Sequence, residues 1–178
     1  MGRTRSHALI CACTAALGVG ILASDAPAAA KRHSKPVVPK TGLAPQVLFE
    51  REVFTEINRV RRSKGLKALR RSNNLWRAAR SHSTHQARIK QMTHYGKGNT
   101  KFSTRLMRFG YDKSARMSEV VGTRNTCERR DPKILVKAWL NSRPHRVLVL
   151  DRKVRNMGVG VVSTARCRQT YYTVDFGS

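Results

Sequence analysis

The C-terminal part of the chain constrains the fold most. Residues 157–162 form an apolar run interrupted by glycines, and residues 170–176 are rich in Tyr, Thr and Val. Two such runs on either side of a short polar segment are typical of a β-hairpin. A helix is expected before them, because Asp131 is a good N-cap residue and Pro132 suits the first helical position. The sequence therefore predicts a helix followed by a hairpin.

The preceding part of the chain is predicted to be mainly helical, because its apolar residues recur at helical spacing. Helices are expected at 46–63, 74–91, 104–109 and 144–150, with one strand at 115–121. Helices first, and then strands mixed with helices, indicate an α+β fold and exclude a regular parallel βαβ sheet. The side chains expected on buried helix faces are Phe49, Val53, Ile57, Val60, Leu75, Ala78, Ala79, His82, Ile89, Leu135, Ala138 and Trp139.

Residues 1–30 have the pattern of a secretory signal peptide: a basic start, an apolar stretch at 8–23 and small residues before a cleavage site after Ala30. The apolar stretch of about 16 residues is short for a membrane-spanning helix. An uncleaved anchor and a lipoprotein are the alternatives. Residues 31–46 combine lysines, an arginine and prolines without apolar periodicity, which indicates a basic linker. Residues 47–178 would then form one domain. The protein is expected to be secreted or associated with the cell envelope, to have no transmembrane span after processing and to be a monomer.

The chain is strongly basic, with 36 Lys and Arg against 10 Asp and Glu and a net charge of +26. Cleavage of the signal would remove Arg3, Arg5 and Asp25, which leaves +25. An exported cation of this size is expected to bind anionic envelope polymers or acidic lipids, and nucleic acid only non-specifically. The alternative is an Arg-rich composition without a binding role. The arginine-rich runs at 59–62 and 70–71 are expected to be solvated, and few aromatic residues accompany them for stacking on bases.

Cys127 and Cys167 are the two cysteines that remain after the predicted cleavage. An even pair in an exported chain indicates a disulfide. It would close a loop of about 40 residues and stabilise the fold by up to ~4 kcal/mol on the loop-entropy estimate. Two free buried thiols are the alternative.

Several aromatic side chains are expected to be structural. His82 lies on the apolar face of its helix and is predicted to be a core histidine, with a metal pair between His82 and His85 as the alternative. Trp139 is expected in the core. Tyr171 and Tyr172 are neighbours on a predicted strand, so one should face inward and the other outward.

Familiar catalytic motifs are absent from the sequence: it contains no His-Glu-x-x-His, no Gly-x-Ser-x-Gly and no P-loop. It contains instead an ordered set of short motifs, Thr93-His94-Tyr95-Gly96, Ser118-Glu119-Val120, Trp139-x-x-Ser142-x-x-His145-Arg146, Gly158-Val159-Gly160 and Asp175-Phe176-Gly177. With this set, residues 50–177 resemble the bacterial branch of the CAP superfamily (cysteine-rich secretory proteins, antigen 5 and pathogenesis-related 1).

The resemblance implies a single-domain α–β–α sandwich whose central cleft is lined by two histidines and one or two glutamates. Carried over to this sequence, His94 and His145 are the histidines and Glu119 is the first glutamate. Ser142 occupies the place of the second glutamate, so the tetrad is incomplete. Val120 replaces the asparagine of the family's Gly-Glu-Asn, which removes a side-chain hydrogen-bonding group from the cleft wall.

The chemistry of these residues leaves more than one function open. Two neutral imidazoles and a carboxylate can bind Zn²⁺ with water in an open position, and such a water can become a nucleophile near neutral pH. His94 and His145 are therefore candidate zinc ligands, and a structural hydrogen-bond network is the other interpretation. The favoured function is a non-catalytic extracellular or envelope binding protein. The alternatives are a metal-assisted hydrolase of an envelope or nucleic-acid substrate, and a lipid or sterol carrier.

Overall fold

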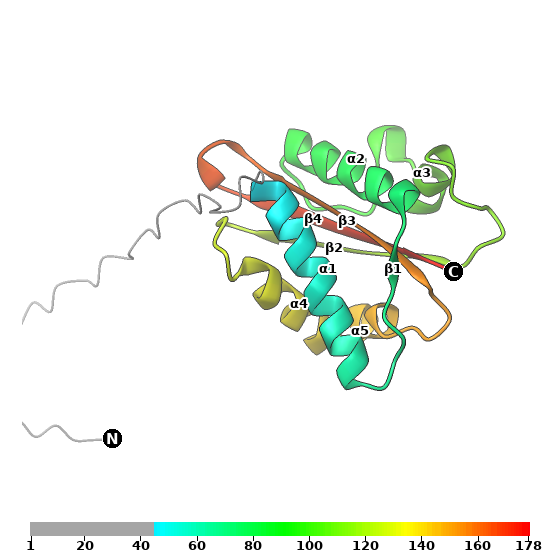
Figure 1. The fold of residues 1–178 in the computed structure, drawn as a ribbon. Helices are drawn as coiled ribbons and strands as arrows, with labels where there is room; N and C mark the ends of the chain where they lie inside the picture. Colours follow the sequence, from blue (N-terminus) through cyan, green and yellow to red (C-terminus); the bar gives the residue numbers. More distant parts are fainter. Residues whose placement is uncertain (1–44) are drawn as a thin grey trace, which may run out of the picture. The chain divides into compact units, whose positions relative to one another are not determined.

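The computed structural model describes residues 45–178 (Figure 1). The predicted signal peptide at 1–30 and nearly all of the predicted linker at 31–46 lie outside the described residues. In chain order the elements are α1 (Pro45–Ser63), β1 (Arg70–Arg71), α2 (Asn73–Ile89), the 3₁₀ turn η1 (Lys97–Asn99), α3 (Phe102–Arg108), β2 (Met117–Arg124), α4 (Asp131–Asn141), α5 (Arg143–Val149), β3 (Asn156–Ser163), the 3₁₀ turn η2 (Ala165–Cys167) and β4 (Thr170–Gly177). No helix in this range is long and apolar enough to cross a membrane.

The strands form one sheet in the order β1-β3-β4-β2. β4 is antiparallel to both β3 and β2, so the predicted hairpin and the predicted strand near 115–121 are confirmed. β1 adds two residues in parallel to the edge of β3. Strand β1 was not predicted from the sequence, because two arginines show no alternation of apolar and polar residues.

Helices cover both faces of the sheet, with α2 and α3 on one face and α1, α4 and α5 on the other (Figure 1). The fold is therefore α+β with three layers, as the sequence analysis expected. The larger apolar core lies between the sheet and the α1–α4–α5 layer. Trp139 belongs to this core, and its indole nitrogen donates to the carbonyl oxygen of Val121 at 2.9 Å.

Alternation along β3 explains how close α2 can approach. Val159 faces the core beneath α1, whereas Gly158 and Gly160 face α2. A Cβ at Gly158 would lie 2.1 Å from the backbone carbonyl carbon of Leu75, and one at Gly160 would lie 2.2 Å from that of Ala79. Real Cβ atoms do not approach backbone this closely, so glycine is required for α2 to rest directly on the sheet.

The position of β4 in the middle of the sheet corrects one expectation. Tyr171 and Tyr172 are both fully buried, so the prediction that one of them faces outward is wrong. Successive side chains do point to opposite faces, but both faces of β4 are covered. Tyr172 packs in the larger core, and the hydroxyl of Tyr171 donates to the side chain of Gln169 at 2.7 Å.

Three further expectations about burial are wrong. Ile89, at the end of α2, is 45% exposed, and Ala138 on α4 is exposed while Val136 is buried in its place. Arg61 was expected to be solvated but is buried. Its guanidinium donates to the carbonyl oxygens of Val149 at 2.8 Å and Asp151 at 3.0 Å, which ties α1 to the end of α5.

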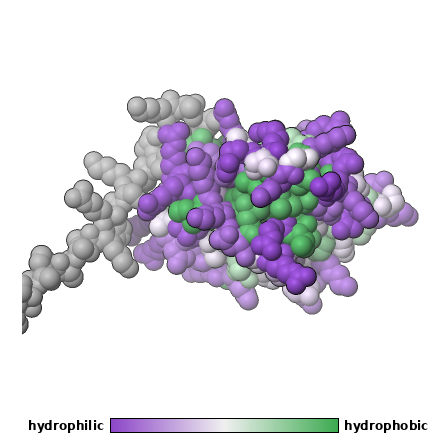
Figure 2. Space-filling model, turned by 90° about the horizontal axis from the view of Figure 1, so that it is seen from below, coloured by the Kyte–Doolittle hydropathy of each residue, from purple (hydrophilic) through white to green (hydrophobic). Residues whose placement is uncertain are grey.

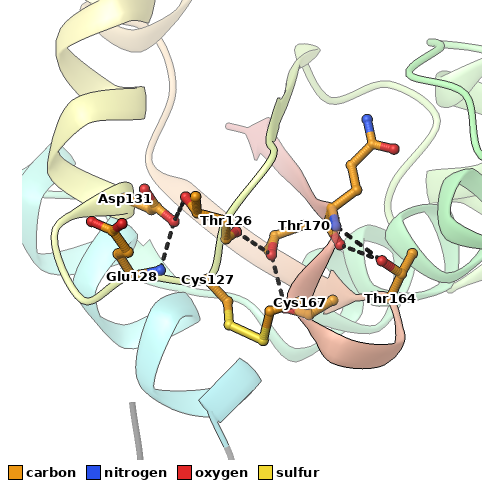
Figure 3. The surroundings of a disulfide bond; sticks show 9 residues. Thr126, Cys127, Glu128, Asp131, Thr164, Cys167 and Thr170 are labelled. Atoms are coloured by element: carbon orange, nitrogen blue, oxygen red, sulfur yellow. Dashed lines mark hydrogen bonds between the residues drawn. A yellow bond between two sulfur atoms is a disulfide. The ribbon is translucent and has the colours of Figure 1, made fainter. Parts of the chain in front are cut away.

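The predicted disulfide between Cys127 and Cys167 is confirmed, with the two Cα atoms 5.4 Å apart (Figure 3). It joins the loop before α4 to the connection between β3 and β4. The hydroxyl of Thr170 donates to the carbonyl oxygen of Thr126 at 2.8 Å beside it. Helix α4 starts with Asp131 as its first residue rather than as its N-cap, and the Asp131 carboxylate accepts the backbone N–H of Glu128 at 2.8 Å.

The molecular surface is not uniformly polar. Seen from below, on the side where α4 and α5 lie in Figure 1, apolar side chains gather in one area between hydrophilic ones (Figure 2). Ile134 of α4 and Val147 of α5 are exposed apolar residues of these two helices. The cationic surface that the composition predicts is therefore interrupted on this side.

Candidate functional site

A cavity of about 550 Å³ opens at the start of β2. The segment from His94 to Ser103, which leads into α3, forms one side, and α5 forms the other. The polar lining residues are His94, Lys101, Ser103, Ser118, Glu119 and His145, and the larger apolar ones are Tyr95, Phe102, Met117, Pro144 and Leu148. The structure thus brings three of the four residues that the resemblance singled out to one cavity.

Glu119 lies at the centre of the polar end. Its side chain is almost fully buried, and each of its two oxygens is hydrogen-bonded. One oxygen accepts from Nδ1 of His94 at 2.8 Å, and the other accepts from a guanidinium nitrogen of Arg105. The hydrogen bond to Glu119 raises the pKa of His94 above its ordinary value. The His94 side chain is about half exposed and lies at the mouth of the cavity, while that of Glu119 is buried.

A second buried carboxyl group shares Arg105. The register of β2 and β4 places Asp175 directly opposite Glu119, and the Arg105 nitrogen lies 3.1 Å from Asp175. Burial raises the pKa of Asp175, against the opposing effect of Arg105. The same Arg105 nitrogen contacts both Glu119 and Asp175, so Arg105 bridges the two carboxyl groups.

Helix α2 holds the backbone next to His94. Nε2 of His82 lies 2.7 Å from the carbonyl oxygen of Thr93, and the side-chain oxygen of Gln86 accepts the N–H of the same residue at 3.1 Å. A carbonyl only accepts, so Nε2 of His82 carries the proton. Burial lowers the pKa of His82 to about 4, so this imidazole is neutral near pH 7. His82 is the core histidine that the sequence analysis expected, and it also positions the loop that carries His94.

His145 reaches the cavity from the first turns of α5. Its Nδ1 lies 2.8 Å from the hydroxyl oxygen of Ser142. Ser142 lies between α4 and α5 and does not line the cavity. Partial burial, together with the charge of His94, lowers the pKa of His145. Ser142 therefore orients an imidazole where the family resemblance places a glutamate. The pKa values of the two histidines are thus shifted in opposite directions, upward for His94 and downward for His145.

The cleft offers few side-chain atoms that are free to bind a zinc ion. His94 and His145 each have Nδ1 engaged, which leaves Nε2 of each for a ligand, while Glu119 is occupied by His94 and Arg105. Catalytic zinc sites have three protein ligands. Within residues 45–178 no group of three or more His, Cys, Asp or Glu side chains could hold a metal ion. The residues present in the cleft therefore do not fit a zinc site of this kind.

No role was predicted from the sequence for Arg105 or Asp175, although Asp175 belongs to one of the motifs that carry the family resemblance. One signal was available: Asp175 is an acid in the middle of an otherwise apolar and aromatic strand, where an unpaired charge is costly. Arg105 gave no comparable signal, because arginine is common throughout this chain. Only the packing of α3 against β2 and β4 brings Arg105, Glu119 and Asp175 together.

Comparisons with known proteins identify the family of this domain. Residues 54–176 match the CAP model of the cysteine-rich secretory protein family. The chain belongs to this family. No curated protein sequence matches the chain.

Solved structures from bacteria share the CAP fold. An outer surface protein from Borrelia burgdorferi has a TM-score of 0.64 at 21% identity, over 73% of this chain and 92% of the other. An extracellular protein with an SCP domain from Bacillus anthracis has a TM-score of 0.65 at 22% identity, over 80% of this chain and 44% of the other. A cysteine-rich secretory protein from Staphylococcus aureus has a TM-score of 0.57 at 23% identity, over 78% of this chain and 40% of the other. The CAP chain thus spans less than half of the latter two proteins.

The first prediction concerns the buried ion pair. Arg105→Leu leaves Glu119 buried without its main partner, so we expect the free energy of unfolding to fall by roughly 3–5 kcal/mol. Arg108→Leu, three residues later on the exposed side of α3, is the matched control and should change it by less than about 0.5 kcal/mol. Urea denaturation measures both. Equal effects of the two substitutions would show that Arg105 does not hold the network together.

The second prediction concerns pH. The folded state binds the His94 proton more tightly than the unfolded chain, so the His94–Glu119 pair stabilises fully below the ordinary pKa of 6.5 and loses its effect as the pH rises through the raised pKa. We expect His94→Gln to destabilise the protein under mildly acidic conditions and to cost progressively less at alkaline pH. Urea denaturation across this range is the measurement.

His145→Gln serves as the control of opposite sign. The lowered pKa of His145 means that the unfolded chain takes up this proton first, so the wild type loses stability as the pH falls below 6.5. Removing the imidazole should therefore make the variant gain stability relative to the wild type at acidic pH. A pH-independent difference for either variant contradicts its assigned shift.

Proposed function

We propose that this CAP-domain protein is an extracellular or envelope-associated binding protein that does not catalyse a reaction. The observation that carries the proposal is the engagement of Glu119. General bases and metal-bound nucleophiles need a carboxylate or imidazole that is free to take a proton or a ligand. Both oxygens of Glu119 are hydrogen-bonded, to His94 and to Arg105. The network therefore supports Glu119 as a fixed part of a prearranged cleft rather than as a general base.

The location and the partner follow from other features. The similar protein from Bacillus anthracis is extracellular, and that from Borrelia burgdorferi is an outer surface protein. Both support the same location for this chain. The net charge of +26 supports anionic envelope polymers as the partner, because a surface with this excess of cations attracts polyanions over a long range. We expect this attraction to be electrostatic and therefore sensitive to salt.

The third prediction tests this function. The protein should sediment with purified bacterial cell walls at low salt and be mostly released at about 0.5 M salt, where exposed charges are screened within a few ångströms. Walls chemically stripped of their phosphate-containing polymers are the control and should retain much less protein. Retention that is unchanged by salt, or equal on stripped walls, would contradict the proposal.

The cleft supports a second candidate function, the binding of an apolar or amphipathic small molecule. Phe102, Met117 and Leu148 form apolar wall on the same cavity that ends at His94 and Glu119. Sites for small molecules combine mostly apolar walls with a few polar groups that fix orientation. A lipid-like ligand would place its chain against the apolar wall and its polar end at the histidines.

The fourth prediction tests the cleft. Met117→Glu puts a charge against the apolar wall, so we expect a fluorescent fatty acid to bind roughly tenfold more weakly or worse, since burying a carboxylate there is costly. Met107→Glu is the control, because Met107 is 40% exposed and does not line the cavity. Circular dichroism checks that both variants fold. Equal affinity in the two variants, or no uptake by the wild type, would remove this candidate.

A further inference from the structure

Two grooves lie next to one another along α2, separate from the cleft. The first, of about 400 Å³, is lined by α2 and by the segment from Gly96 to Phe109. The second, of about 850 Å³, is lined by the C-terminal end of α2 and by the connection between β3 and β4. Thr84 and Arg88 line both grooves. The two grooves therefore adjoin at Thr84 and Arg88, and together we call them the α2 track.

The α2 track has an excess of exposed positive charge. No Asp or Glu residue is among the described residues that line either groove. The exposed cations of the track form no ion pair with any residue from 45 to 178, whereas Arg59, Arg80 and Arg116 elsewhere are paired with Glu or Asp. These free cations are Arg88, Lys90, Lys97, Arg108, Arg166 and Arg168.

The walls of the track are held in place by other contacts. Arg166 and Arg168 stand on either side of Cys167, whose disulfide to Cys127 fixes this connection to the loop before α4 (Figure 3). The N–H of Thr164 also donates to the carbonyl oxygen of Gln169 at 2.8 Å across the same connection. Cations on a fixed backbone lose less conformational entropy on binding than those on a mobile tail.

Two residues that line the first groove also have side-chain nitrogens without a hydrogen-bond partner among the described residues. Arg105 and His82 form part of its wall. Nε and Nη1 of Arg105 and Nδ1 of His82 are buried without a hydrogen-bond partner among the described residues. Arg105 therefore borders two sites: one guanidinium nitrogen binds Glu119 and Asp175 beneath the cleft, and the residue also forms part of the wall of the first groove. Buried guanidinium donors are suited to phosphate oxygens.

The dimensions and lining of the track indicate the kind of partner. From Ser81 to Lys90, which line the two grooves, α2 advances by about 14 Å at 1.5 Å per residue. This length exceeds a single phosphate and fits a chain with repeated charges. Phe109 is the one Phe, Tyr or Trp among the described residues that line the track, so there is no platform on which successive bases could stack. A concave track also fits a chain better than the flat surface of a bilayer.

We propose that the α2 track is the binding surface for a linear polyanion with repeated phosphate groups, such as a poly(glycerol phosphate) chain. The proposal rests on the proposed function and locates it: the track, and not the cationic surface as a whole, holds the envelope polymer. Arg88 occupies the junction of the two grooves and contacts the chain at its centre. The cleft remains free for its own ligand.

The fifth prediction compares two variants with the same loss of charge. The track variant carries Arg88→Gln, Lys97→Gln, Arg108→Gln and Arg168→Gln. The control variant carries Arg62→Gln, Lys64→Gln, Lys67→Gln and Arg152→Gln, which are exposed cations near the C-terminal ends of α1 and α5. All eight positions have negative φ. Residues 1–44 are identical in the wild type and both variants, so their charges contribute equally.

Binding to poly(glycerol phosphate) is measured by calorimetry at several salt concentrations. Four lost phosphate contacts should lower the slope of log K against log salt by about 3 and weaken binding more than tenfold at low salt. The control variant should keep the wild-type slope within about 1. Equal losses in the two variants would overturn the α2 track while leaving the proposed function intact, whereas a wild type that does not bind the polymer would overturn both.

Two other probes decide the class of partner. A single-stranded DNA oligonucleotide and vesicles of acidic phospholipid are titrated into the same three proteins. We expect both to bind the wild type more weakly than poly(glycerol phosphate) at equal phosphate concentration. Tighter binding of either probe that depends on the four track residues would overturn the assignment to a phosphate polymer. Circular dichroism and urea denaturation confirm that the variants remain folded.

Discussion

The buried pair between Arg105 and Glu119 is the interaction on which the functional end of the molecule depends. It joins α3 to β2, and through Asp175 it also reaches β4. A guanidinium in a dry environment is tolerated only when its charge is compensated, so these elements must stay together for the fold to be stable. Glu119 in turn fixes the ring of His94 at the mouth of the cleft. One ion pair thus connects the stability of the sheet to the geometry of the cleft.

The close contact between α2 and the sheet makes this arrangement precise. Gly158 and Gly160 allow the helix backbone to lie against β3. At this distance His82 and Gln86 reach the backbone of Thr93 and fix the loop before His94. A side chain at either glycine would push the helix away, and the hydrogen bonds to Thr93 would lengthen with it. The neutrality of the buried His82 follows from the same packing, because water cannot reach it to stabilise a charge.

The charged groups of the protein serve two different purposes according to whether they are paired. In the interior, Arg61 and Arg105 are held by carbonyl oxygens and carboxylates and act as structural links. At the surface, no Asp or Glu among residues 45–178 lines the α2 track, so the field of its cations is directed at the solvent and at anionic partners. Arginine suits both purposes, because its planar group makes several directed hydrogen bonds and always keeps its charge.

The sequence by itself predicted the α+β class, the hairpin, the disulfide and, through the family resemblance, the three residues His94, Glu119 and His145 that line the cavity, because periodicity, cysteine count and ordered motifs are properties of the chain alone. It did not determine that Tyr171 and Tyr172 are both buried, since a strand cannot indicate whether one or both of its faces are covered. It gave no role to Arg105, Asp175 or Arg61, because the partners of a charge lie far away in the chain. Which of many arginines are paired inside and which remain free along α2 was decided only by tertiary packing, which fixes the distance to each carboxylate.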